Sequence, residues 1–191
     1  MDKILPHKSL PTNAKKVFQG EIFSVWQWPQ KLYDGSIKTF ELLERPDTAY
    51  LLPVLPDGKI LLVDDEQPHR SPVLTIPRGM VESNELPEAG AVRECLEETG
   101  YRSETVINWF SYRAYLKNIW TIHFFIGRNT TKVAEPAEEP GERITLHPVS
   151  FEEFIHLGGS GQLQDLKLQT IILEAQLDTA KMDRLKQLLY G

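Results

Sequence analysis

The chain of 191 residues is 41% hydrophobic and 25% charged, a composition typical of one ordinary globular domain. Its formal net charge of −6 argues against a broad basic surface that would bind nucleic acid or an anionic membrane. We therefore expect neither as partner. Cys95 is the only cysteine, which excludes an internal disulfide and a zinc site built from cysteines. We find neither a signal-peptide pattern nor a stretch of about 18 apolar residues, and therefore expect a cytoplasmic protein.

The first 76 residues predict mostly β-structure, because runs rich in Val, Ile, Phe and Trp alternate with turn residues. The predicted strands span residues 16–29, 37–43, 48–55, 59–63 and 73–76. Asp34-Gly35 marks the turn of a first hairpin, and Pro56-Asp57-Gly58 marks that of a second. The strands of the second hairpin are nearly continuous apolar runs, so we expect both of their faces to be buried.

Pro87 begins a predicted helix that ends at Gly100, since proline at the first position and glycine after the last are the usual ends. We expect this helix to pack through Val92, Leu96 and Thr99. At about 100° per residue this stripe lies opposite a run of glutamates, which should then point away from the packing surface.

The second half of the chain returns to strands and ends in helices. Strands are predicted at 106–112, 120–126 and 143–148, with an acidic, proline-rich loop at 134–141. Ser150, with Glu153 three residues later, is a capping-box pattern that opens a helix. Residues 163–189 should be mostly helical, with Leu166 among the side chains available for burial. The order of elements indicates a mixed α/β domain rather than a regular βαβ repeat.

Glu94, Glu97 and Glu98 lie three and four residues apart, which places them on one helix face. Like charges at this spacing destabilise an isolated helix by a few tenths of a kcal/mol, so an external cation is expected to neutralise them. Carboxylate oxygens are the ligands that Mg²⁺ prefers. The sequence therefore predicts a divalent metal site on this helix.

The segment from Gly79 to Tyr101 follows the pattern G-x5-E-x7-R-E-U-x-E-E-x-G-U, in which U is apolar. The seven fixed positions are filled by Gly79, Glu85, Arg93, Glu94, Glu97, Glu98 and Gly100. At roughly 6% per residue type, this match would arise by chance on the order of once in 10⁸ to 10⁹ starting positions. The segment resembles the Nudix box.

This resemblance implies an α/β Nudix fold, an α/β/α sandwich with a mixed β-sheet, here preceded by a β-rich N-terminal extension. We divide the chain accordingly into the extension, residues 1–46, and a Nudix hydrolase domain, residues 47–191. The implied reaction is Mg²⁺- or Mn²⁺-dependent hydrolysis of a nucleoside diphosphate linked to another moiety.

The resemblance also assigns roles to the residues of the box. Glu94, Glu97 and Glu98 would be metal ligands, with a backbone carbonyl near Gly79 completing the shell. Glu97 would also belong to the catalytic group. Two further members of that group, Glu85 and Arg93, would support it, because Arg93 is placed to pair with Glu85 and orient it.

Outside the box the chain resembles the ADP-ribose pyrophosphatase and nucleoside-diphosphate-sugar hydrolase branch. The features shared are the β-rich start, the segment LLPVLPDGKILLVDDEQPHR, and a strand running into P-x-G. In that branch the N-terminal strands often pack across a homodimer and help to hold the base, so we expect a homodimer. Trp28 is a candidate for stacking on the base, while core packing or a dimer contact is the favoured explanation for any single aromatic residue of this hairpin.

Two arginines and two loop glutamates complete the predicted site. Arg70, with Gln67, falls where the branch often has Q-x-R and suits a phosphate or ribose oxygen. Arg78 stands where many members have alanine, and could contact a terminal sugar, a phosphate or solvent. In this branch a glutamate from the loop before the last strand serves as general base, and Glu139 and Glu142 are the candidates, with no preference between them.

The preferred substrate on this reading is ADP-ribose or a nucleotide sugar. Dinucleoside polyphosphates and nucleoside triphosphates remain alternative substrates. An alternative of another class is a catalytically silent Nudix domain that binds a nucleotide or regulates a partner. Complete retention of the box glutamates speaks against that second class.

Overall fold

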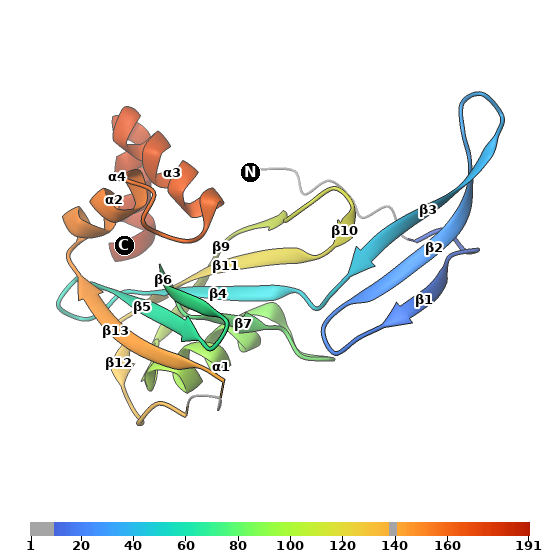
Figure 1. Ribbon diagram of the computed structural model, residues 1–191. Helices are drawn as coiled ribbons and strands as arrows, with labels where there is room; N and C mark the ends of the chain where they lie inside the picture. The colour runs from blue at the N-terminus through green and yellow to red at the C-terminus, as the bar shows by residue number, and fades with distance from the viewer. Residues whose placement is uncertain (1–9, 138–140) are drawn as a thin grey trace.

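The computed structural model describes residues 10–137 and 141–191, which form a layered body and a projecting arm (Figure 1). The body contains a mixed sheet and a smaller antiparallel sheet. The mixed sheet has the order β7 (Arg78–Met80), β4 (Thr48–Pro53), β11 (Thr121–Arg128), β9 (Thr105–Arg113). The smaller sheet has the order β13 (Arg143–Val149), β5 (Ile60–Gln67), β6 (Arg70–Thr75). Within the β7-β4-β11-β9 sheet, β4 and β11 are the one parallel pair among the described strands, and the other two pairs are antiparallel, which makes this sheet mixed.

Helices cover both sides of these sheets, as an α/β/α sandwich requires (Figure 1). On one side lies α1 (Pro87–Thr99), next to the two-residue strands β8 (Tyr101–Arg102) and β12 (Thr131–Lys132). On the other lie α2 (Phe151–Gly159), α3 (Leu166–Leu177) and α4 (Thr179–Tyr190). The predicted α/β fold class is confirmed. In the described part of the chain, no helix is both long and apolar enough to cross a membrane.

The hydrophobic core has two parts, one on each side of the mixed sheet. The larger part joins the sheets to α2, α3 and α4, and its centre is Phe124, stacked between Tyr50 at 4.5 Å and Phe110 at 4.6 Å. The smaller part joins α1 to β4 and β11 through small side chains, among them Ala91 and Cys95. The small side chains let the helix axis approach the sheet closely.

The predicted hairpin of residues 48–55 and 59–63 is wrong, although its turn exists. The Leu55 N–H donates to the Lys59 carbonyl at 2.8 Å, and Val54 forms one bridge with Ile60. Beyond that bridge β4 and β5 enter different sheets, because β7 and β11 already occupy the two edges of β4. The expected burial is correct, since every residue of β4 is buried. The continuous runs of apolar residues correctly predicted that these strands are buried, but they could not predict which strands pair with them.

The expected packing face of α1 is correct for Thr99 but wrong for Val92 and Leu96, by about one residue or 100°. The buried residues are Gly90, Ala91, Cys95, Glu98 and Thr99, whereas Val92 and Leu96 are only partly buried. The helix packs through its small residues instead of its bulky ones. One of the glutamates, Glu98, is thereby turned into the interior.

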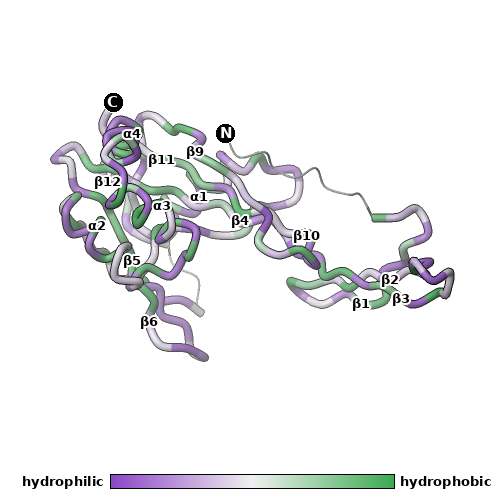
Figure 2. The backbone as a smooth tube through the Cα atoms, turned by 90° about the horizontal axis from the view of Figure 1, so that it is seen from above, coloured by the Kyte–Doolittle hydropathy of each residue, from purple (hydrophilic) through white to green (hydrophobic). Residues whose placement is uncertain are grey.

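The N-terminal strands form an arm that projects from the body in both views (Figures 1 and 2). Its sheet has the order β1 (Lys15–Gln19), β2 (Ser24–Lys31), β3 (Ile37–Glu44), β10 (Asn118–Ile119). The short strand β10 comes from the body and runs parallel to the end of β3, so it ties the arm to the body. Hydrophobic stretches lie along the arm in Figure 2, and Val17, Phe18 and Phe40 are each about half exposed.

The C-terminal helices have capped ends that the sequence only partly indicated. The Glu153 N–H donates to Ser150 Oγ at 3.1 Å, as the capping-box pattern predicts. The single helical stretch expected at 163–189 is two helices, because Asp178 ends α3 and caps α4. Leu166 is 74% exposed, contrary to expectation, and Leu168 is buried in its place.

Leu168→Ala is therefore expected to lower the free energy of unfolding by about 2–5 kcal/mol, because it leaves a cavity among α2, α3 and the sheet. Leu166→Ala, the matched change on the same helix, should stay within about 0.5 kcal/mol of wild type. Urea denaturation followed by circular dichroism measures both values. Equal losses in the two variants would contradict the packing of α3.

Candidate active site

A cavity of about 790 Å³ opens between the box helix α1 and the sheets. Its lining includes the α1 carboxylates Glu94, Glu97 and Glu98, here called the acidic wall, and the arginines Arg45, Arg70 and Arg78, here called the basic wall. The arm reaches its edge through Ile22, which lies in the turn between β1 and β2. The cavity thus combines an acidic wall and a basic wall within the reach of one small ligand.

Arg93 holds three of the box glutamates together. Its Nε and Nη2 donate to the two oxygens of Glu85 at 3.0 Å each, and its Nη1 donates to Glu94 at 2.8 Å and Glu97 at 3.0 Å. Nη2 also donates to the Met80 carbonyl, which ties the helix to the loop before it. The hydrogen bonds with Glu85 raise the pKa of Arg93, and those with Arg93 lower the pKa of Glu85. The expected Arg93–Glu85 pair is present.

Two of the box glutamates, Glu98 and Glu94, are desolvated. Glu98 is only 8% exposed, and its Oε2 accepts from the Arg78 N–H at 3.2 Å. Burial raises the pKa of Glu98 well above its usual range and also raises that of Glu94. Glu97 is the most open of the three, with its side chain 46% exposed. The expectation that all three point away from the packing surface is therefore wrong for Glu98.

Gly79 explains how Glu94 reaches the cavity. A Cβ atom at this position would overlap the carboxylate of Glu94. Gly79 lies in β7 and pairs with Ala49 of β4, so the strand cannot move aside without breaking the sheet. Glycine is therefore required here for the close approach of a side chain rather than for a special backbone angle.

The segment after β12 crosses the end of α1 and leads toward the cavity. The N–H groups of Val133 and Ala134 donate to the Gly100 carbonyl, and the Ala137 N–H donates to the Glu97 carbonyl at 2.8 Å. Gly100 has a φ of 77°, the left-handed conformation that ends α1 and favours glycine. These contacts place the chain beside the acidic wall.

Glu142 lies at the cavity, and Glu139 lies outside the described residues. Glu142 Oε1 accepts from Gln67 Nε2 at 3.0 Å, and the negative charge of Glu142 contributes to the raised pKa values of Glu94 and Glu98. Of the two loop candidates, the structure therefore brings Glu142 to the acidic wall.

The basic wall contains both predicted arginines and one that the sequence analysis missed. Arg70 and Arg78 each contact the carboxylate of Asp65, at 2.6 Å and 3.1 Å. Arg45 lies over the ring of Trp120, 4.4 Å from its centroid, and its Nε is buried without a hydrogen-bond partner. Asp65 and Arg45 had no motif to mark them, because their importance comes from packing between elements distant in sequence.

Comparison with known proteins agrees with the box. The family model described as NUDIX domain matches residues 44–165, which is more than half of the chain. The chain belongs to the NUDIX domain family. The resemblance inferred from residues 79–101 and the prediction of a Nudix hydrolase are confirmed.

Relatives of this Nudix domain extend over nearly the whole chain. An ADP-ribose pyrophosphatase of Bacillus subtilis (strain 168) is 26% identical over 171 residues, 87% of this chain and 91% of the relative. A methanol dehydrogenase activator of Bacillus methanolicus is 23% identical over 94% of this chain and 98% of the relative. A solved structure described as an ADP compounds hydrolase has a TM-score of 0.66 and 16% identity, with 86% of this chain and 90% of that chain covered. That last likeness concerns the fold alone.

The Nudix box has the chemistry of a divalent-cation site. Oxygen donors from Glu94, Glu97 and Glu98 border one cavity, and two of these groups are buried at a cost in desolvation that a cation would offset. Within residues 10–137 and 141–191, no three side chains are arranged to hold a metal as they stand. In this arrangement Arg93 forms ion pairs with both Glu94 and Glu97.

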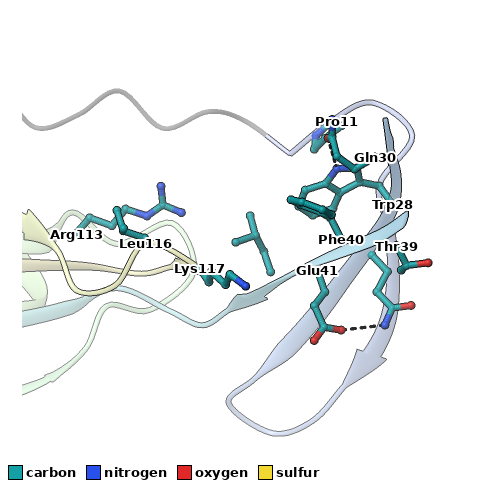
Figure 3. Close-up of a pocket in the computed structure, with 11 residues that line it drawn as sticks. Pro11, Trp28, Gln30, Thr39, Phe40, Glu41, Arg113, Leu116 and Lys117 are labelled. Carbon is teal, nitrogen blue, oxygen red and sulfur yellow. Dashed lines mark hydrogen bonds between the residues drawn. The ribbon is translucent and has the colours of Figure 1, made fainter. Parts of the chain in front are cut away.

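Trp28 does not line the active-site cavity of its own chain. It borders a second cavity, of about 740 Å³, between the arm and the segment of residues 113–117 (Figure 3). Its ring is tilted against Phe40 at 6.2 Å, and its Nε1 donates to Gln30 Oε1 at 3.0 Å. A contact between Trp28 and substrate would therefore need the site of a second chain.

Gly79→Ala is expected to weaken the binding of Mn²⁺ and to abolish turnover, because the new methyl group displaces the Glu94 carboxylate. Isothermal titration calorimetry with Mn²⁺ measures the first effect. Gly141→Ala, at a glycine whose added Cβ meets no atom of the described residues within 4 Å, is the matched control for Mn²⁺ binding. Wild-type affinity in Gly79→Ala would remove Glu94 from the metal site.

Proposed function

We propose that this chain is a metal-dependent pyrophosphohydrolase that cleaves the diphosphate of an ADP-linked sugar, with ADP-ribose as the first candidate. The observation that carries this proposal is the single cavity with the box carboxylates on one wall and three arginines on the other. A diphosphate needs both, since its oxygens bind cations and guanidinium groups. The name of one relative, the ADP-ribose pyrophosphatase, supports an ADP-linked substrate.

Mg²⁺ or Mn²⁺ would be held by Glu94, Glu97 and Glu98, together with a backbone carbonyl near Gly79. Bound there, the ion supplies charge neutralisation at the diphosphate and lowers the pKa of a coordinated water. Arg93 fixes the carboxylates of Glu85, Glu94 and Glu97 relative to one another through its four hydrogen bonds. These residues orient the donor set before substrate arrives.

Glu142 is the general base that the geometry favours, because it lies at the cavity and is oriented by Gln67. Its carboxylate would take a proton from the attacking water. Glu139 remains the alternative, since it belongs to the same loop. Arg70 and Arg78 would contact the phosphate farther from the box, as a fork of N–H donors suits a phosphate.

A regulatory role is the second candidate, and one observation favours it: a relative similar over most of its length is named an activator of another enzyme. Every fixed residue of the box is nevertheless present here. The same assay separates the two candidates.

Wild-type protein with Mg²⁺ is expected to release AMP from ADP-ribose or an ADP-sugar, within a panel that includes a dinucleoside polyphosphate and a nucleoside triphosphate. Glu97→Gln should lower kcat by at least about 100-fold, because it removes a charged metal ligand. Glu142→Gln should lower kcat strongly while leaving the affinity for Mn²⁺ near wild type. Chromatography of the nucleotide products measures the rates.

Glu88→Gln is the matched control, a glutamate in the first turn of the same helix that does not line the active-site cavity. No release from any compound of the panel would contradict the enzymatic function. A wild-type kcat in Glu142→Gln would show that Glu142 is not the general base and would assign that role to Glu139 or to a box glutamate.

We also propose that the chain is a homodimer joined through the described part of the arm, residues 10–46. The arm exposes more apolar surface than a monomer usually leaves in one region, including Val17 at 53% and Phe18 at 55%. Among the described residues β1 pairs with β2 alone, and its outer edge is where we propose that a second chain packs. A second arm packed there would bring the Trp28 cavity of one chain toward the body of the other.

Light scattering after size-exclusion chromatography should give the mass of two chains. Phe18→Asp should shift the protein toward one chain, because it places a charge in the apolar contact. Leu177→Asp, an exposed position on α3 far from the arm, should leave the dimer intact. A monomeric wild type at tens of micromolar, about the range in which such contacts are usually populated, would contradict the proposal.

A further inference from the structure

Asp65 is a buried carboxylate shared by two arginines. It lies in β5 and is 5% exposed. Its Oδ2 atom is 2.6 Å from Arg70 Nη2 and 3.1 Å from Arg78 Nη2. Its Oδ1 atom is buried and has no hydrogen-bond partner among residues 10–137 and 141–191. One oxygen thus carries both ion pairs, and the other keeps an unused acceptor.

Both guanidinium groups are fixed from further sides. Arg70 Nη1 donates to the backbone carbonyl of Asp65 at 2.6 Å. Arg78 Nη1 donates to Thr75 Oγ1 at 2.6 Å, and its guanidinium lies over the Tyr50 ring at 5.5 Å. Each group has five N–H donors, so these bonds leave N–H groups of both arginines available. Both side chains line the active-site cavity.

Two guanidinium groups this close repel each other unless an anion lies between them. Asp65 supplies that anion, but burying a charged cluster costs desolvation, and apolar replacements of such clusters are often equally stable. Stability alone is therefore a weak reason for this arrangement. One carboxylate for two arginines leaves one net positive charge, which matches one singly ionised phosphate of a diphosphate ester.

We propose that Asp65 is a positioning residue, which holds Arg70 and Arg78 side by side so that together they bind the substrate phosphate farther from the Nudix glutamates. This inference rests on the proposed function and names a subsite within it. The unused Oδ1 atom can accept an N–H from either arginine when its guanidinium turns toward the phosphate.

The test compares Asp65→Asn with Asp64→Asn. Asp64 is the adjacent residue in β5, and its carboxylate pairs with His147 at 2.7 Å instead of lining the cavity. Calorimetric Kd for ADP-ribose without metal, and KM and kcat with Mg²⁺, are measured for both. Asp65→Asn should weaken Kd and raise KM by about 10- to 100-fold, the value of a charge-assisted hydrogen bond, with kcat within about threefold.

A variant lacking both arginines, Arg70→Met/Arg78→Met, separates positioning from a general effect on folding. In that background Asp65→Asn should change Kd and KM by less than about twofold, because Asp65 acts only through the arginines. Thermal unfolding of each variant identifies any that fail to fold. Asp65→Glu keeps the negative charge and should therefore bind ADP-ribose more tightly than Asp65→Asn.

Wild-type Kd and KM in Asp65→Asn, or an unchanged Asp65 effect after removal of both arginines, would overturn the inference. Equal losses in Asp64→Asn would overturn it as well. Absence of turnover in the wild type would contradict the proposed function while leaving Kd to decide the role of Asp65. Absence of any measurable binding of ADP-ribose to the wild type would overturn this inference too.

Discussion

The close packing of α1 against the mixed sheet is the constraint on which the site depends. Because Ala91 and Cys95 are small, the helix lies near β4, and its next buried residue in the same stripe is Glu98. A carboxylate is thereby placed in the interior, where only hydrogen bonds and nearby cations can offset its desolvation. The Arg78 N–H meets that requirement at Glu98, while Gly79 and Arg93 accommodate the neighbouring Glu94.

The charges of the cavity are balanced locally rather than across its width. On the acidic wall Arg93 neutralises part of the glutamate charge, and on the basic wall Asp65 neutralises part of the arginine charge. The acidic wall therefore keeps an excess of negative charge, and the basic wall keeps an excess of positive charge. Under the proposed function, a ligand with one metal-binding phosphate and one arginine-binding phosphate would satisfy the two excesses at once, as a diphosphate does and a single phosphate does not.

The arm and the segment before β13 attach to the cavity by few but specific contacts. The arm contributes Ile22 to the rim and is tied to the body through β10. The segment is tied to the end of α1 through the carbonyls of Gly100 and Glu97. The arm and the segment before β13 are therefore additions to the α/β sandwich that border the cavity. Under the proposed function, they are placed where the group linked to the diphosphate would be recognised.

The sequence by itself determined the box, the ends of α1, the fold class and the pairing of Arg93 with Glu85, because these depend on spacing within one short segment. Only the tertiary structure decided which face of α1 is buried, since small residues can pack closer than the bulky ones that hydrophobic periodicity favours. It also decided that β4 and β5 enter different sheets, because partner strands come from distant parts of the chain. For the same reason Asp65 and Arg45, which no motif marks, became part of the site only when β4, β5 and β7 were brought together.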